Sequence, residues 1–172
     1  LYGHPADMDA LRALADARGL WVVEDAAEAH GARYKGKPVG GLGRVGTFSF
    51  YGKKIFTSGE GGAVTLDDPA LERRARILRG QGMDPDRRYW FPVVGYNYRL
   101  TNVACAILCA QLERREAILA RRRDVCAAYR RALAGTPGIG FQPVAAWAEP
   151  APWLFSVTLD PVAFGRTRDE LM

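Results

Sequence analysis

The first stretch of the chain shows a helical pattern followed by a short apolar run. Apolar residues recur at helical spacing along Pro5–Arg18, which predicts a helix, and Gly19 is placed to end it. The continuous apolar run Leu20–Val23 predicts a strand buried on both faces of a parallel sheet. Because this run ends in Glu24 and Asp25, the pattern is that of an α/β protein with acidic side chains at the carboxyl end of a strand.

Two more strands and a helix are expected after a glycine-rich loop. The β-branched and aromatic run Thr47–Tyr51 predicts a second strand, and Ala63–Leu66 predicts a third. A short connection containing the turn Gly59–Gly62 joins them, so these two strands are expected to pair antiparallel. An aspartate then caps a helix that is predicted over Pro69–Leu78.

One long helical pattern dominates the second half of the chain. It covers Thr101–Leu133, with room for one break, and the most plausible domain boundary lies within it, near residues 110–120. Beyond it, Trp153–Leu159 is a strand candidate and Arg166–Leu171 has the pattern of a helix that is just beginning. Both ends of the sequence look cut, so we expect a piece of a longer protein.

The surplus of positive charge does not by itself indicate a nucleic-acid partner. The chain has 24 basic and 19 acidic side chains, a formal net charge of +5. The arginines lie mostly within helical patterns and are mixed with acidic residues, which is typical of solvated helix faces, although an anionic substrate would also suit them. No basic and aromatic interleaving or known binding motif is present, so no nucleic acid is expected to bind.

The apolar runs and the cysteines bear on the location of the protein in the cell and on whether it binds a metal. The apolar runs are far shorter than the ~20 residues that span a bilayer, and no signal peptide opens the chain, so no membrane association is expected. Cys105 and Cys109 share a helix face without a histidine or second cysteine pair nearby, so they and Cys126 are interpreted as buried small hydrophobic residues and no metal site is expected. An odd number of cysteines favours a reducing cytoplasm.

Candidate chemistry is found in a few polar residues beside the predicted strands. Asp25 could hold a protonated ring nitrogen, but it could equally cap the next turn. Lys54 or Lys53 could be a nucleophilic amine, and since adjacent strand residues point to opposite faces, one of the two should face away. Ser49 precedes Lys54 by five residues, and Asn97, just ahead of a helix, could form a turn or reach a phosphate.

The order and spacing of these residues resemble a known family. The likeness runs from about residue 3 to about residue 160 and rests on four strings in sequence: EDAAEAHG from Glu24, TFSFYGKK from Thr47, GEGG from Gly59 and YNYR from Tyr96. They resemble the DegT/DnrJ/EryC1/StrS family of sugar aminotransferases. The resemblance implies an α/β protein with the aspartate-aminotransferase-like fold, pyridoxal-phosphate (PLP) fold type I. It also implies that residues 1–115 are the C-terminal part of the PLP-binding large domain and that residues 116–172 are the linking helix and an incomplete small domain.

The resemblance also implies a role for each matched residue. Lys54 matches the catalytic Schiff-base lysine, which its distance from Ser49 and from the Gly59 turn selects over Lys53, where relatives usually have asparagine. Asp25 is expected to pair with the pyridine nitrogen, Ala27 to pack under the ring and Glu28 to lie near its phenolic oxygen. Ser49 is expected to bind the cofactor phosphate, and Asn97 to reach the cofactor phosphate of the other subunit.

The function implied is transfer of an amino group from glutamate to the keto carbon of a nucleotide-linked 4-keto-6-deoxy sugar, in a cytoplasmic homodimer with shared active sites. Within the family, Glu28 and the loop segments Arg79–Pro85 and Arg88–Pro92 resemble the GDP-perosamine synthases. Family members are more than twice this length, so residues 1–172 alone are expected to be inactive. Two alternatives stay open: a non-catalytic regulatory or dimerisation module that kept the fold, and a 3-dehydratase, although such relatives carry histidine in place of Lys54.

Overall fold

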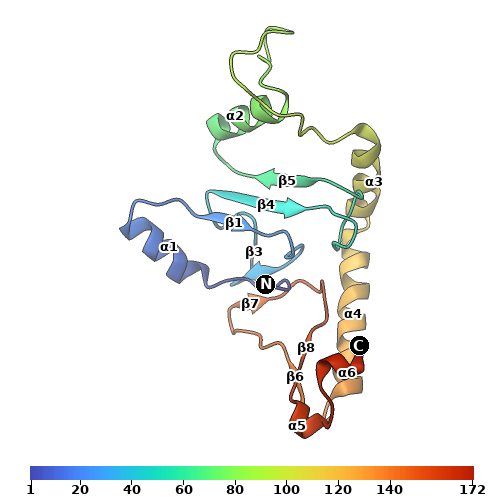
Figure 1. The fold of residues 1–172 in the computed structure, drawn as a ribbon. Coiled ribbons are helices and arrows are strands. Elements are labelled where there is room, and N and C mark those ends of the chain that lie inside the picture. Colours follow the sequence, from blue (N-terminus) through green and yellow to red (C-terminus); the bar gives the residue numbers. More distant parts are fainter.

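A three-stranded sheet forms the centre of the molecule (Figure 1). The structure is a computed structural model that describes residues 1–172. Strand β4 (Val45–Ser49) lies between β1 (Val23–Asp25) and β5 (Gly62–Thr65), in the order β1-β4-β5. The pair β1–β4 is parallel and the pair β4–β5 is antiparallel. The predicted second and third strands and their antiparallel pairing are therefore confirmed, each within two residues.

The predicted first strand is wrong in its position and in its burial. The strand begins only at Val23, and Leu20, Trp21 and Val23 are 61%, 68% and 62% exposed. The ladder with β4 begins at the pair Val23–Val45, and the only backbone hydrogen bond between the two segments before it joins the amide of Arg44 to the carbonyl of Val22 at 2.9 Å. Apolar content therefore misplaced the strand, since pairing decides where a strand begins.

Two helices flank this sheet at the predicted positions. Helix α1 (Met8–Ala17) is capped by Asp7, whose carboxylate accepts from the amide of Ala10. Helix α2 (Pro69–Arg79) is capped by Asp68, which accepts from two amides of the first turn, and has proline in its first turn. Two of its four arginines, Arg73 and Arg76, form exposed ion pairs, as expected for a solvated helix face.

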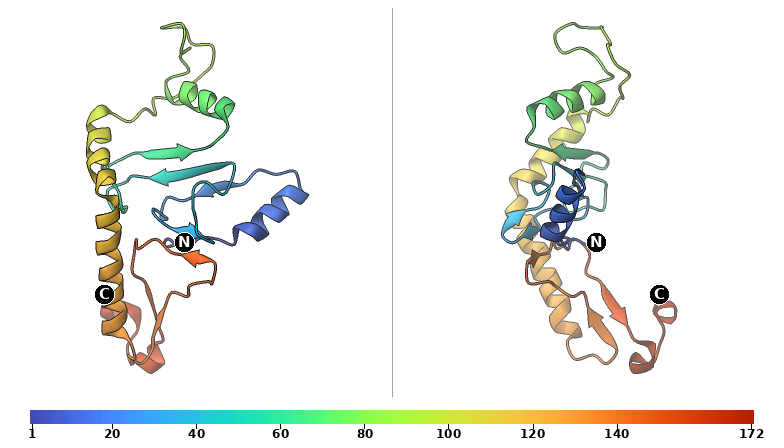
Figure 2. Two further views of the ribbon diagram at one scale, coloured as in Figure 1. Left: turned by 180° about the vertical axis from the view of Figure 1, so that it is seen from behind. Right: turned by 90° about the vertical axis from the view of Figure 1, so that its left-hand side faces the viewer.

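A long helical rod runs along one side of the molecule (Figure 2). It consists of α3 (Asn102–Glu113) and α4 (Arg115–Leu133), which meet at Arg114 in a non-helical conformation. The predicted helical pattern is therefore confirmed, and the one break that it allowed lies at Arg114. Neither helix is long and apolar enough to cross a membrane, and no other helix is. The interpretation of the cysteines as buried is wrong, because Cys109 is exposed and Cys105 and Cys126 are only half-buried on this rod.

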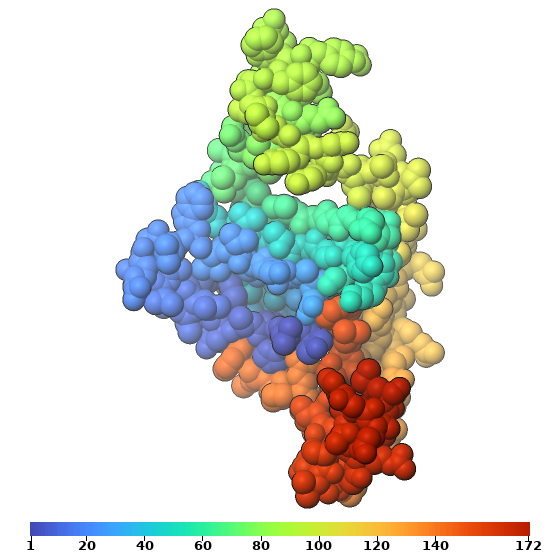
Figure 3. All heavy atoms as spheres, viewed as in Figure 1, coloured from blue at the N-terminus to red at the C-terminus, as the bar shows by residue number.

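The remaining strands and short helices lie below the central sheet. Two small sheets are present, with the orders β3-β2-β7 and β6-β8, and all their pairings are antiparallel. Their elements, with the two short C-terminal helices, are β2 (Arg33–Tyr34), β3 (Lys37–Pro38), β6 (Ile139–Phe141), β7 (Ala148–Glu149), β8 (Val157–Leu159), α5 (Pro161–Phe164) and α6 (Arg168–Leu171). In the space-filling view the C-terminal residues form one projecting end and the loop after α2 forms the other (Figure 3).

The predicted strand over Trp153–Leu159 forms only in its second half. Strand β8 spans Val157–Leu159, because its partner β6 offers only three residues. Trp153 instead donates its amide to the carbonyl of Ala151 at 2.9 Å, which closes a tight turn beside Pro152. This turn returns the chain to the central sheet. The domain boundary expected at residue 115 stays a prediction.

The main hydrophobic cluster joins the central sheet to the helical rod and to this turn. It contains eight buried residues, drawn from the loop before β2, the loop after β4, both rod helices and the C-terminal turn: Ala32, Phe50, Ile55, Phe56, Leu108, Leu119, Ala151 and Trp153. Gly3 allows the N-terminus to approach the turn, since a Cβ there would lie 2.5 Å from the carbonyl oxygen of Ala151. Residues far apart in sequence therefore share one core.

A buried carboxylate fixes the glycine-rich loop against the sheet. Glu24, in β1, is 8% exposed and accepts hydrogen bonds from the amides of Gly40 (2.8 Å), Leu42 (2.5 Å) and Gly43 (2.6 Å). A Cβ at Gly46 would collide with the backbone of Gly40, so the loop lies directly on β4. Three amide donors on one carboxylate satisfy a charge that would be costly to bury alone.

We expect Glu24→Gln to lower the free energy of unfolding by about 2 kcal/mol, because an amide nitrogen would face backbone donors that then lose their acceptor. Urea titration of the full-length protein measures this loss. The control is Glu72→Gln, in an exposed pair with Arg76 on α2, which should cost no more than about 0.5 kcal/mol. Equal losses in the two variants would contradict the role of Glu24.

Candidate functional site

Two of the predicted site residues lie on one face of the sheet, near the carboxyl ends of parallel strands. Asp25 is the last residue of β1 and lies beside Thr47, two residues before Ser49 at the end of β4. Side chains alternate along a strand and neighbouring strands lie about 5 Å apart, so the Cα atoms of Asp25 and Ser49 are about 8 Å apart. Parallel pairing thus brings these two polar side chains to the same place.

The residues after β1 form a turn at this edge. Asp25 is exposed, and its Oδ1 atom accepts from the amide of Ala27 at 3.1 Å. Glu28 is half-buried and its carboxylate accepts from the amide of Tyr2 at 2.9 Å. The Asp25 carboxylate therefore has an oxygen left for a further donor, whereas the Glu28 carboxylate is turned toward the N-terminal segment.

The residues after β4 form the second part of this edge. The Ser49 hydroxyl accepts from the amide of Tyr51 at 3.3 Å and can still donate its own hydrogen. Lys53 and Lys54 follow in a turn, where Lys53 is exposed and Lys54 is half-buried. Their different exposure separates two lysines that chemistry alone left equivalent.

Lys54 faces aromatic side chains rather than an acid. Its Nζ atom lies 4.3 Å from the centre of the Trp153 ring, and it takes part in none of the six ion pairs of the chain. Its charge also lowers the pKa of His30, so the imidazole is an electrostatic neighbour. The Lys54 ammonium is therefore not tied to a carboxylate within this chain.

His30 is enclosed by phenylalanine rings. It is 5% exposed, its ring centre lies 5.4 to 5.8 Å from those of Phe48, Phe50 and Phe56, and its Nε2 atom has no hydrogen-bond partner. Burial, and secondarily the charge of Lys54, lower the pKa of His30 from 6.5 to about 4. The imidazole is therefore uncharged at neutral pH.

Asn97 is not brought to the other predicted site residues within the chain. It is exposed in the loop that follows α2, where its backbone pairs with Gly80, and its side chain makes no hydrogen bond. The position leaves it free for contact outside this chain, and its role stays a prediction.

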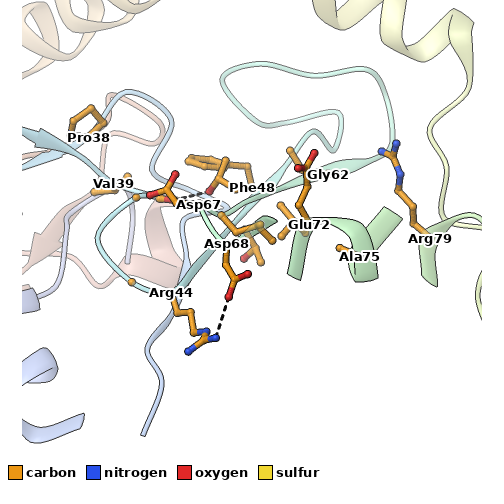
Figure 4. Close-up of a pocket in the computed structure, with 18 of the residues that line it drawn as sticks. Pro38, Val39, Arg44, Phe48, Gly62, Asp67, Asp68, Glu72, Ala75 and Arg79 are labelled. Atoms are coloured by element: carbon orange, nitrogen blue, oxygen red, sulfur yellow. Dashed lines mark hydrogen bonds and ion pairs between the residues drawn. The ribbon is translucent and has the colours of Figure 1, made fainter. Parts of the chain in front are cut away.

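Two clefts adjoin the central sheet. The larger, about 1600 Å³, lies between α2, the glycine-rich loop and the face of β4–β5 that carries Phe48 (Figure 4). It is lined by charged groups that are already paired in part, such as Arg44 with Asp68, and it contains none of the predicted site residues. The smaller, about 900 Å³, has Asp25, Ala27 and Glu28 in its wall. Three of the predicted site residues therefore line the smaller of the two clefts, and none lines the larger one.

Comparison with known proteins identifies the family and the fold. The profile of the DegT/DnrJ/EryC1/StrS aminotransferase family matches residues 1–172. The chain belongs to this family. Its members are named aminotransferases, and the fold is the α/β fold of the PLP-dependent sugar aminotransferases, so the predicted family and fold class are confirmed.

Several curated relatives are named as enzymes of GDP- or dTDP-linked amino sugars. The chain is 48% identical over its full length to the GDP-perosamine synthase of Caulobacter vibrioides, of which it covers 46%. It is 45% identical over 99% of its length to the dTDP-3-amino-3,4,6-trideoxy-alpha-D-glucose transaminase of Streptomyces venezuelae, of which it covers 43%. The chain thus spans less than half the length of these relatives.

Solved structures extend the likeness to three dimensions. S. venezuelae DesV in complex with a ketimine intermediate matches 99% of this chain with a TM-score of 0.87 and 45% identity, over 44% of its own length. DesI in the presence of its TDP-sugar product matches 99% of this chain with a TM-score of 0.89 and 34% identity, over 43% of its own length.

Sequence reasoning missed two residues beside Lys54. His30 stood inside a matched string but had no assigned role, and Trp153 was only the first residue of a strand candidate. A tryptophan between prolines and apolar residues gives no local signal of what its ring contacts. Only the packing of the C-terminal turn on the sheet places it beside a lysine 99 residues earlier.

We expect His30 to make stability depend on pH. Because its pKa falls from 6.5 in the unfolded chain to about 4 in the fold, its contribution is complete above pH 6.5 and is lost as the pH falls toward 4. Urea titrations of the full-length protein measure the free energy of unfolding at pH 7 and at pH 4. The decrease between the two pH values should be about 2 kcal/mol smaller in His30→Phe than in the wild type. An identical pH dependence in both proteins would contradict this assignment.

Proposed function

We propose that the full-length protein is a PLP-dependent aminotransferase that moves an amino group from glutamate to the keto carbon of a nucleotide-linked 4-keto-6-deoxy sugar. The observation that supports this best is a half-buried lysine without an acidic partner, Lys54, just beyond the sheet edge where Asp25 and Ser49 share a face. Family membership over residues 1–172 and relatives named for nucleotide-sugar amination support the same reaction.

The chemistry of these side chains fits a pyridine ring that carries a phosphate and an aldehyde. Asp25 has an exposed carboxylate with one oxygen free of hydrogen bonds, which suits a protonated ring nitrogen. The Ser49 hydroxyl keeps a hydrogen to donate to a phosphate oxygen. Lys54 supplies the primary amine that would hold the aldehyde carbon. When bound, the cofactor supplies an electron sink for a carbanion next to nitrogen.

The chain's own residues would then have distinct tasks. Asp25 holds the proton on the ring nitrogen, and the methyl side chain of Ala27 leaves room for the ring. Lys54, once its amine is free, would take the proton from the α-carbon of glutamate as general base and deliver it, as general acid, to the carbon of the cofactor that had been the aldehyde carbon. Glu28 is the proposed neighbour of the ring's phenolic oxygen, which requires its carboxylate to leave the Tyr2 amide.

The finer parts of the proposal concern substrate and assembly. The greater identity to a GDP-perosamine synthase than to a dTDP-sugar transaminase, 48% against 45%, favours a GDP-linked sugar by a narrow margin. The exposed position of Asn97 suits a contact with the cofactor phosphate of a second subunit, so the proposed assembly is a cytoplasmic homodimer with shared active sites.

The assignment of Lys54 is tested by substitution of each lysine of the pair. The full-length protein with PLP should show an absorption band in the visible, and borohydride should attach the cofactor to the peptide that contains Lys54. Lys54→Ala should lose the band and reduce kcat by at least about 10²- to 10⁴-fold. Lys53→Ala is the matched control and should keep both, whereas a band that persists in Lys54→Ala would exclude this role.

The choice of nucleotide is tested by competition between substrates. The full-length protein, with glutamate as amino donor, should convert GDP-4-keto-6-deoxymannose with a kcat/KM at least about tenfold higher than a dTDP-linked 4-keto-6-deoxy sugar, the ratio that corresponds to the net free energy of about one hydrogen bond. Product is followed by mass spectrometry as replacement of the keto oxygen by an amino group. A preference for the dTDP sugar would reject GDP and leave the reaction class intact.

A further inference from the structure

Trp153 makes two contacts with the pair of lysines. Its ring face lies under the ammonium of Lys54, with Nζ 4.3 Å from the ring centre. Its indole Nε1–H donates to the carbonyl oxygen of Lys53 at 3.0 Å. One side chain therefore holds both the backbone of this turn and the end of the Lys54 side chain.

Trp153 is itself held rigidly. It is 6% exposed within the main hydrophobic cluster. Its carbonyl oxygen accepts from the guanidinium of Arg122, in α4, at 3.1 Å, and its amide donates to Ala151. Ala151 in turn donates its amide to Gly3 at 2.9 Å. The indole is thus fixed by the helical rod, the C-terminal turn and the N-terminal segment together.

We propose that Trp153 is a positioning residue for Lys54, which receives the lysine's amine on its ring face whenever that amine is not bonded to the cofactor. This inference rests on the proposed function for the role of Lys54. The ring attracts the ammonium electrostatically, and no acid competes for it, because Lys54 forms no ion pair. The uncharged imidazole of His30 adds no repulsion at neutral pH.

The same two contacts explain why Lys54 and not Lys53 faces inward. With the Lys53 carbonyl fixed by the indole, the Lys53 side chain is exposed and the Lys54 side chain lies over the ring. The C-terminal turn therefore decides which lysine is presented at the sheet edge. A change in the position of that turn would move the amine with it.

A second tryptophan offers a matched control. Trp21 also lies under a cation, with the guanidinium of Arg44 4.0 Å from its ring centre, but it is 68% exposed and contacts neither lysine. Removal of its ring should leave Lys54 unaffected. The pair Trp153→Leu and Trp21→Leu therefore separates loss of a cation–π contact in general from loss of the contact at Lys54.

The test measures how accessible Lys54 is in the cofactor-free full-length protein. Reductive methylation is followed by peptide mass spectrometry, and the rate at Lys54 is divided by the rate at Lys53. Trp153→Leu should raise this ratio about fivefold, because the amine is no longer held on the ring. Trp153→Phe keeps an aromatic face and should raise it only about twofold, whereas Trp21→Leu should leave the wild-type ratio.

The outcomes distinguish this inference from the proposed function. An unchanged ratio in a folded Trp153→Leu protein would overturn the positioning role. If that variant fails to fold, Trp153→Phe decides, and an unchanged ratio there overturns it as well. A visible PLP band that survives Lys54→Ala would instead reject the proposed function, whatever the methylation ratio. A raised ratio in Trp21→Leu would also overturn the inference, since the effect would not be specific to Trp153.

Discussion

The parallel pairing of β1 with β4 is the constraint on which the candidate site depends. It places Asp25 beside Thr47 and thereby puts Asp25 and Ser49 on one face, near the ends of their strands. The Glu24 carboxylate stabilises this pairing, because its three amide donors lie in the loop that leads into β4. Since neighbouring strand residues point to opposite faces, the acid at position 24 is buried and bound to the loop, whereas the acid at position 25 is exposed, as the proposed contact with a cofactor requires.

The aromatic cluster beside the sheet connects this edge to the rest of the chain. His30 is neutral because burial among phenylalanine rings disfavours its charged form, and so it packs as an apolar ring. Trp153 enters the same cluster from the C-terminal turn and contacts both lysines. The position of Lys54 is therefore coupled to residues about 100 positions later in the chain, and through Arg122 to the long helical rod.

Local signals predicted most helices and strands but not their exact limits. The glycine that follows α1 and the aspartate that caps α2 depend on neighbouring residues, and these two predictions were confirmed. The strand expected at Leu20–Val23 was misplaced, because a strand exists only where a partner offers hydrogen bonds. In the two small sheets only β8 was expected, within Trp153–Leu159. The other strands there have two or three residues and are too short to show a period.

By itself the sequence determined the family, the order of the elements and the identity of the candidate site residues, because these depend on residue types at fixed spacing. Tertiary structure alone decided three things. It placed Asp25 and Ser49 on one face of the sheet, and it buried Glu24 while it left Asp25 exposed. It also placed Lys54 rather than Lys53 against the Trp153 ring. Each of these follows from contacts between segments distant in sequence. Local spacing carries no information on such contacts, since they form only when the chain folds back on itself.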